Sequence, residues 1–171
     1  MKIALAGKMR SGKDTIAEFA VNTYGFKHFA FGDELKRHYH ELFGEKESKP
    51  RSGYQWFGQV ARSHDPDIWV DKCFQTLNGY EDNNIIITDL RQPNEYKKCK
   101  EEGFYIIKVH CDDDLRLQRI LSKNDSFNPD DLNHETEQHI DSYKCEYVIT
   151  NNGTLEELEQ QFIDIFNEIN K

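Results

Sequence analysis

Nine residues near the beginning of the chain have the types and spacing of a phosphate-binding loop. They read Gly-Lys-Met-Arg-Ser-Gly-Lys-Asp-Thr, from Gly7 to Thr15, and follow a short apolar run. The backbone N–H groups of such a loop surround a phosphate chain, and its lysine reaches the outer phosphates. The sequence therefore predicts a site for a nucleoside triphosphate. The residues expected to bind it are Gly7, Arg10, Ser11, Gly12, Lys13, Asp14 and Thr15.

One position of this loop departs from the usual pattern. The residue after the lysine is normally Ser or Thr, because a hydroxyl there holds Mg²⁺. Here that residue is Asp14, and the hydroxyl comes one position later, at Thr15. Two interpretations stay open. Either Thr15 supplies the metal-ligating hydroxyl, or Asp14 acts through a water, since Mg²⁺ keeps several waters.

A second polar pair follows the apolar run Ile85 to Thr88. Asp89 ends this expected strand, and Arg91 comes two residues later. An Asp at the end of a buried strand is typical of a carboxylate that holds Mg²⁺ directly or indirectly. The alternative is a helix-capping Asp, because Pro93 begins a helix. We favour the magnesium site, since an Arg beside it provides bidentate phosphate binding.

A third group of residues follows the second expected strand. Each of them alone suits a solvated charged face, but together they can form an acceptor site for a phosphorylated small molecule. The group comprises Asp33, Lys36, Arg51, Arg62, Asp65 and Trp69. Tyr54 and Trp69 belong either to a base pocket or to the core, whereas Trp56 and Phe57 are expected in the core.

A fourth group predicts a lid at about residues 112–133. Arg116 and Arg119 are three apart and share a helix face, and a polar stretch, Ser122 to Asn133, follows them. An Arg-bearing helix with a mobile loop can close over a transferring phosphoryl group and exclude water. The alternative is a surface helix balanced by neighbouring aspartates. A zinc site at His134 is rejected, because the second His of the H-E-x-x-H pattern is replaced by Gln138.

Strand and helix signals alternate along the chain. Strands are predicted at Ile3 to Ala6, Phe26 to Phe31, Ile85 to Thr88, Phe104 to Val109 and Glu146 to Thr150. Helices are predicted at Lys13 to Tyr24, Asp33 to Phe43, Tyr54 to Arg62, Asp65 to Leu77, Glu95 to Glu102, Asp112 to Leu121 and Leu155 to Ile169. This order indicates a three-layer α/β P-loop NTPase fold, with about five parallel strands and helices on both faces. Ligands then bind at the carboxyl ends of the strands.

Composition narrows the class of protein. The 171 residues suit one domain, 1–171. A net charge of −9 argues against a nucleic acid polymer as partner. No run approaches the ~20 apolar residues of a membrane span, and no secretory signal is recognised. The four cysteines form no C-x-x-C pair and are expected to be reduced packing residues of a cytoplasmic protein.

Taken together, these segments resemble the deoxynucleoside monophosphate kinases of the phage type, a P-loop kinase family, over nearly the whole chain. The family's loop also carries G-K-D-T, so Asp14 is a family trait. Tyr54 stands where the family usually has Leu. The other matching segments are Phe31-Gly-Asp-Glu-Leu-Lys36, Arg51 to Trp69 with its D-P-D-x-W, Thr88 to Glu95, His134 to Glu137 and Ile149 to Glu157.

The resemblance implies transfer of the ATP γ-phosphate to a deoxynucleoside monophosphate, with Mg²⁺. It implies that Asn152 and Gly153 lie near the adenine and that Thr15, Asp14 and Asp89 hold the metal. It implies an acceptor site made by Asp33, Lys36, Arg51, Arg62, Asp65, Trp69 and Arg91, and a catalytic set of Lys13, Arg91, Arg116 and Arg119. A homodimer stays open. The alternatives are a kinase for dephospho-coenzyme A or phosphomevalonate, which share the loop motif, and a non-catalytic nucleotide-binding regulator.

Overall fold

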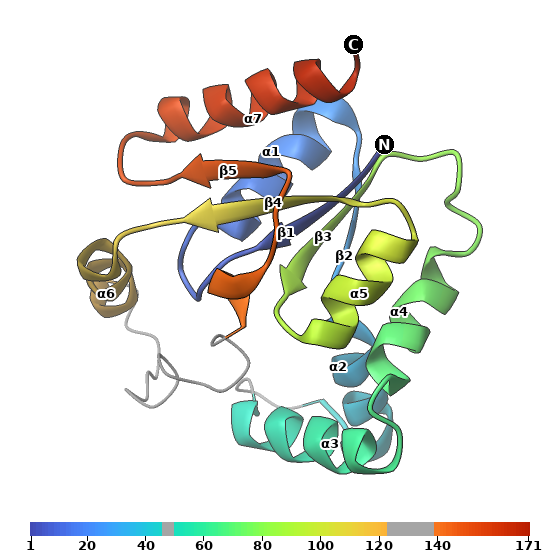
Figure 1. The fold of residues 1–171 in the computed structure, drawn as a ribbon. Helices are drawn as coiled ribbons and strands as arrows, with labels where there is room; N and C mark the ends of the chain where they lie inside the picture. The colour runs from blue at the N-terminus through green and yellow to red at the C-terminus, as the bar shows by residue number, and fades with distance from the viewer. Residues whose placement is uncertain (46–49, 123–138) are drawn as a thin grey trace.

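A five-stranded parallel sheet, in the order β2-β3-β1-β4-β5, forms the centre of the computed structural model (Figure 1). The structure describes residues 1–45, 50–122 and 139–171. β1 is the central strand, and its Ala4 pairs with Ile87 on one side and Ile106 on the other. The strands are β1 (Lys2–Ala6), β2 (Lys27–Phe29), β3 (Ile85–Leu90), β4 (Tyr105–His110) and β5 (Tyr147–Thr150). The predicted P-loop fold is therefore confirmed.

Helices cover both faces of the sheet and bury its apolar side chains in two separate cores. α1 (Lys13–Tyr24) and α7 (Leu155–Ile169) pack on one face, where Phe162 is fully buried. α2 (Phe31–Phe43), α4 (Ile68–Leu77) and α5 (Pro93–Glu101) contribute to the core on the other face. The remaining helices are α3 (Arg51–His64), α6 (Asp113–Ser122) and the short 3₁₀ helix η3 (Ile140–Ser142).

Local signals define the ends of α1 and α7, which have the predicted bounds. Gly25 ends α1 with φ of +69°, a left-handed conformation that glycine adopts without steric cost. Thr154 and Glu157 form a reciprocal capping box at the beginning of α7. Both signals lie within a few residues of the helix that they terminate, so the sequence alone was sufficient to place these ends.

The beginning of α2 differs from the prediction that Asp33 caps this helix. α2 begins two residues earlier, at Phe31, and its N-cap residue is Ala30, which has no capping side chain. Asp89, at the end of β3, accepts hydrogen bonds from the N–H groups of Phe31 at 2.8 Å and Gly32 at 2.9 Å. The cap therefore comes from a residue distant in the sequence, which local pattern could not show. Asp89 does cap a helix, but it is α2 and not the helix that Pro93 begins.

Two further expectations about this region were wrong. The helix expected from Asp65 begins at Ile68, because Asp65 ends α3 and its carboxylate accepts from the N–H of Asp67 at 3.1 Å. Trp56 was expected in the core, but 55% of it is exposed, since it lies on the solvent side of α3. Among the described helices, none has the length and apolar character needed to cross a membrane.

Candidate active site

Two glycines let the phosphate loop follow its path between β1 and α1. A Cβ at Gly7 would lie 2.6 Å from the carbonyl oxygen of Val109 on β4. Gly12 has φ of +106°, and a Cβ there would lie 2.1 Å from Nδ2 of Asn151. Neither position can carry a side chain. At Gly7 the backbone of β4 is too close, and at Gly12 both the nearby Asn151 and the positive φ exclude a Cβ.

Side chains from three elements hold the carbonyl groups of the loop. Lys13 Nζ on α1 donates to the carbonyl oxygens of Gly7 at 2.6 Å and Lys8 at 2.9 Å. Asn151, directly after β5, donates from Nδ2 to the carbonyl of Ser11 at 2.8 Å. Arg116 on α6 donates from Nε to the carbonyl of Met9 at 2.8 Å. These bonds hold the carbonyl oxygens, which would repel a phosphate, in fixed directions.

A cleft of about 610 Å³ runs along the loop, and we call it the donor cleft. Arg119 and Gly153 line it, together with Leu155 and Leu158. Its residues include six positions of the loop and several groups that follow the strands. They are Met9, Arg10, Gly12, Lys13, Asp14, Thr15, Arg51, Thr88, Asp89, Arg91, Arg119, Ser122, Asn151, Gly153, Leu155 and Leu158.

A second cleft of about 530 Å³, the acceptor cleft, adjoins the first. It lies between β3, α2 and α3, and Asp33, Lys36, Tyr54, Arg62 and Trp69 line it. The two clefts share six residues: Met9, Asp14, Arg51, Thr88, Asp89 and Arg91. The arginines predicted to bind phosphate, Arg51 and Arg91, and the aspartates predicted to bind metal, Asp14 and Asp89, therefore lie where the two clefts meet.

Asp89 lies at this junction in an unusual electrostatic environment. Burial raises the pKa of its carboxyl group, while the hydrogen bonds from Gly32 and Phe31 and the positive charge of Arg91 lower it. Each carboxylate oxygen accepts one bond from the first turn of α2, so each retains a lone pair for a further partner. The positive end of the α2 dipole favours the negative charge at this position.

Glu95, which the sequence analysis did not assign to the site, lines the acceptor cleft. Its carboxylate accepts from the N–H groups of Arg91 at 2.8 Å and Gln92 at 2.9 Å, and so holds the turn after β3. Burial, with a contribution from the charge of Asp89, raises its pKa to about 7. Burial also lowers the pKa of Arg62, which the charge of Glu95 partly restores. The Gln-x-x-Glu spacing of this capping box was the available signal.

The raised pKa of Glu95 predicts a pH dependence of stability. Its ordinary value is 4.5, so between pH 4.5 and 7 the native state binds a proton that the unfolded state has lost. Stability from this group is therefore lost as pH rises through that window. Glu95→Gln lacks this titration. Between pH 4 and pH 8, its free energy of unfolding should therefore rise relative to that of wild type by on the order of 3 kcal/mol. Guanidinium unfolding across this range measures it.

The matched control for this prediction is Glu101→Gln, which removes a carboxylate from the same helix. The Glu101 side chain is 55% exposed, in contrast to that of Glu95. The control should leave the pH dependence of unfolding as in wild type. Parallel pH profiles for Glu95→Gln and wild type would contradict the assignment of the titration to Glu95.

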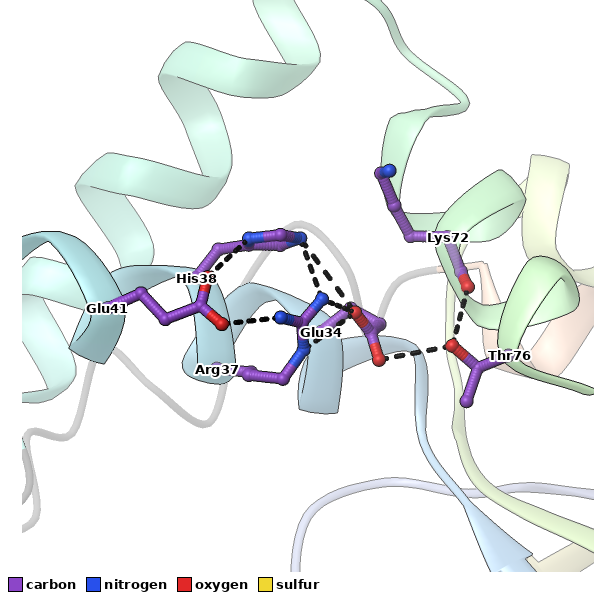
Figure 2. A network of polar contacts seen from close by, with 6 residues as sticks. All are labelled: Glu34, Arg37, His38, Glu41, Lys72 and Thr76. Carbon is purple, nitrogen blue, oxygen red and sulfur yellow. Dashed lines mark hydrogen bonds and ion pairs between the residues drawn. The ribbon is translucent and has the colours of Figure 1, made fainter.

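A polar network holds α2 against α4 (Figure 2). Glu34 accepts from Arg37 at 2.6 Å and from the hydroxyl of Thr76 on α4 at 3.1 Å. The hydrogen bond with Arg37 lowers the pKa of Glu34, so Glu34 is ionised at neutral pH. The network anchors one side of α2, while the helix lines the acceptor cleft with Asp33, Leu35 and Lys36.

The D-P-D-x-W segment joins the walls of the acceptor cleft. Asp67 accepts from Asn94 of α5 at 2.8 Å, and the indole N–H of Trp69 donates to the carbonyl of Gly58 on α3 at 3.3 Å. A Cβ at Gly58 would lie 2.5 Å from Cδ1 of Leu35 and 3.3 Å from the guanidinium of Arg62, so this glycine leaves room chiefly for Leu35 of α2. Asp65 makes a turn, as described above, and is not among the residues that line the cleft.

The structure brings most of the predicted site residues into the two clefts. The exceptions among the described residues are Gly7, Ser11, Asn152, Asp65 and Arg116. Asn152 accepts instead from the N–H of Asp112, which links the closing loop to α6. Residues 123–133 of the expected lid and the segment His134 to Glu137 lie outside the described residues.

Three further residues of the site were missed in the sequence analysis. Asn151 holds the loop, and Thr88 and His28 line the acceptor cleft, with 2.8 Å between Thr88 Oγ1 and His28 Nε2. His28 and Thr88 lie at the carboxyl ends of β2 and β3, where ligands of parallel sheets bind. That position was the signal that could have identified both.

Comparison with known proteins agrees with this architecture. The AAA domain family (AAA_18) matches residues 3–140, and the chain belongs to this family. It is 28% identical to a candidate deoxynucleotide monophosphate kinase of Acanthamoeba polyphaga mimivirus, over 94% of this chain and 93% of that protein. It is 26% identical to an adenylate kinase of Bacteroides thetaiotaomicron, over 100% and 99% of the two chains.

Solved structures show the same fold. A gluconokinase from Sinorhizobium meliloti 1021 superimposes with a TM-score of 0.63 at 13% identity, over 98% of this chain and 92% of that chain. The phosphate loop, the two adjoining clefts and these relatives define the class: the chain is a P-loop kinase of nucleotides or other small molecules. The resemblance to the deoxynucleotide kinases is confirmed at the level of the family.

Proposed function

We propose that this protein transfers the γ-phosphate of ATP to a deoxynucleoside monophosphate, giving the diphosphate. The observation that carries the proposal is the junction of the donor and acceptor clefts, where both share Asp14, Arg51, Asp89 and Arg91. A phosphate donor on the loop and a phosphate acceptor on Arg51 and Arg91 would meet there. The name of the mimivirus relative supports a deoxynucleotide as acceptor.

In the donor cleft, the phosphates of ATP lie against the loop and Lys13 neutralises the outer ones. The adenine then lies beside Arg119 and Gly153, which line the same cleft. Arg119 is held by a 3.1 Å hydrogen bond to the carbonyl of Asn151, so its charge is fixed beside the triphosphate path. Asn152 supports this region through its bond to α6.

The oxygen groups at the junction fit Mg²⁺. Thr15, Asp14 and Asp89 line the donor cleft, and they offer a hydroxyl and two carboxylates. Mg²⁺ takes oxygen ligands, is usually bound through one or two carboxylates plus substrate phosphates, and keeps several waters. The described residues contain no cluster of three or more acidic, His or Cys side chains that would bind a metal without substrate. The ion would supply charge neutralisation between the donor phosphates.

The acceptor binds in the segment of about residues 33–72, which forms one part of a single domain. Its phosphate is held by Arg51 and Arg91, while Arg62 and Trp69 surround the nucleoside. The attacking oxygen is already anionic, so no general base is required. Catalysis then consists of positioning and charge neutralisation, with the lid at about residues 112–133 excluding water.

A panel of acceptors tests the proposal. Release of ADP is measured in a coupled assay with ATP, Mg²⁺ and each deoxy- or ribonucleoside monophosphate, together with dephospho-coenzyme A and phosphomevalonate. We expect ADP release that depends on a deoxynucleoside monophosphate. Activity with only dephospho-coenzyme A or only phosphomevalonate would contradict this function and indicate a metabolite kinase. ATP binding without any acceptor-dependent ADP would indicate a nucleotide-binding regulator.

Arg91→Ala tests the acceptor assignment. Arg91 lines both clefts, and its buried Nε has no hydrogen-bond partner among the described residues, so the guanidinium can receive a phosphate. The variant should raise the KM for the acceptor by about 10- to 100-fold, because a charge-assisted bidentate contact is lost. The affinity for ATP, measured by calorimetry, should change much less. A variant with only its ATP affinity changed would place Arg91 in the donor site.

A further inference from the structure

The phosphate loop is tied to α6 by a buried arginine. Arg116 donates from Nε to the carbonyl of Met9 and from Nη1 to the carboxylate of Asp113, at 2.8 Å and 2.5 Å. The Arg116 side chain is 4% exposed, whereas that of Asp113 is 72% exposed. Arg116 is not among the residues that line either cleft. Its position therefore differs from that of an arginine that reaches a transferring phosphoryl group.

The bond to Met9 has a consequence for the next peptide N–H. The C=O and N–H of a trans peptide point in opposite directions. A carbonyl of Met9 fixed toward α6 therefore directs the N–H of Arg10 away from α6. Arg10 has φ of +63°, and among the described residues it is the one non-glycine residue with positive φ. A residue other than glycine keeps a positive φ only where contacts with the surrounding structure stabilise it.

Such a left-handed residue within a turn lets successive N–H groups form a concave nest for an anion. In this shape Arg116 holds the carbonyl of Met9 and Asn151 holds that of Ser11. We propose that Arg116 is a positioning residue that fixes the Met9–Arg10 peptide and so pre-forms the anion nest of the loop. The inference rests on one part of the proposed function, namely that the loop binds the phosphates of ATP.

Hydrogen exchange in the nucleotide-free protein tests this role. Arg116→Met retains much of the side-chain volume and removes the guanidinium, with its bonds to Met9 and Asp113. The amides of the loop, residues 7–12, should then exchange about tenfold faster, since a hydrogen bond from a charged group is lost. Arg116→Lys should restore part of the protection, because lysine can donate to one carbonyl. Gln118→Met, exposed on the same helix, is the matched control and should exchange as wild type.

Ligand binding supplies the second readout. Inorganic tripolyphosphate carries the phosphate chain without a base, so it reports on the loop alone. Arg116→Met should weaken tripolyphosphate and ATP by a similar factor, about tenfold. If the variant lost affinity for ATP but not for tripolyphosphate, Arg116 would contact the adenine, and the proposal would be overturned. Weaker binding of both ligands with unchanged exchange in the free protein would show a direct phosphate contact and also overturn it.

A milder variant keeps the proposal falsifiable if Arg116→Met does not fold. Asp113→Ala removes the exposed carboxylate that orients the guanidinium and leaves the bond to Met9 in place. It should raise exchange in residues 7–12 by a smaller factor, and unchanged exchange would overturn the proposal. None of these measurements uses an acceptor, so they stay valid if a deoxynucleoside monophosphate fails as substrate.

Discussion

Lys13→Met should lower turnover on the order of 10³-fold while the protein stays folded. Lys13 is 7% exposed, and its ammonium bridges the carbonyl groups of Gly7 and Lys8. An outer phosphate of ATP would compete for the same ammonium, and a developing negative charge would bind it more strongly still. Removing the charge therefore removes stabilisation that grows toward the transition state.

The fold should survive this change because the two carbonyl groups keep other support. Lys8 also accepts from the N–H of Ser11 at 3.2 Å, and Gly7 directly follows the buried strand β1. Steady-state turnover and the melting temperature are measured together. Lys97→Met, which removes an exposed charge of α5, is the control and should retain full activity. Activity of Lys13→Met within a few-fold of wild type would refute the role of Lys13.

Asp89→Asn should separate activity from stability. The carboxylate is expected to hold Mg²⁺ at the cleft junction, so the neutral amide should lower turnover by roughly 10²- to 10³-fold. Stability should change little. Burial disfavours the ionised carboxyl, as the raised pKa of Asp89 indicates, and this gain offsets the loss of one of the two bonds from α2, since only the amide oxygen can accept.

Asp89→Ala is the informative comparison. It removes the metal ligand and also both acceptors for the N–H groups of Phe31 and Gly32. We expect the same loss of turnover with a loss of about 1–3 kcal/mol in the free energy of unfolding. Denaturant unfolding and Mg²⁺ titrations of the rate distinguish the variants. Full activity of Asp89→Asn at limiting Mg²⁺ would exclude Asp89 from the metal site.

Sequence pattern predicted those features whose determinants are local. The ends of α1 and α7 depend on Gly25 and on Thr154 with Glu157, all close to the helices that they terminate. The phosphate loop was equally clear, because its two glycines and its lysine lie within seven consecutive residues, Gly7 to Lys13. The sheet followed from the alternation of short apolar runs and helices.

The remaining features depend on contacts between distant residues. Asp89 caps a helix 58 residues earlier, and Arg116 bonds to Met9 across 107 residues. Neither contact has a local signal, so Asp33 was expected to be the cap, and the bond from Arg116 to the loop was not foreseen. Trp56 shows a related limit: it is one of several aromatics on α3, and only the packing of α3 shows which of them faces solvent. The catalytic and binding roles themselves stay predictions.

The bond between Asn151 and Ser11 has a consequence for synthesis of the chain. The loop is made 140 residues before the side chain that anchors it, and α6 also follows the loop by about a hundred residues. During translation the loop sequence is therefore complete long before its shape can be fixed. Nucleotide binding should be among the last properties that the nascent chain acquires, and ATP in the cell would stabilise the finished chain without assisting the earlier steps of its folding.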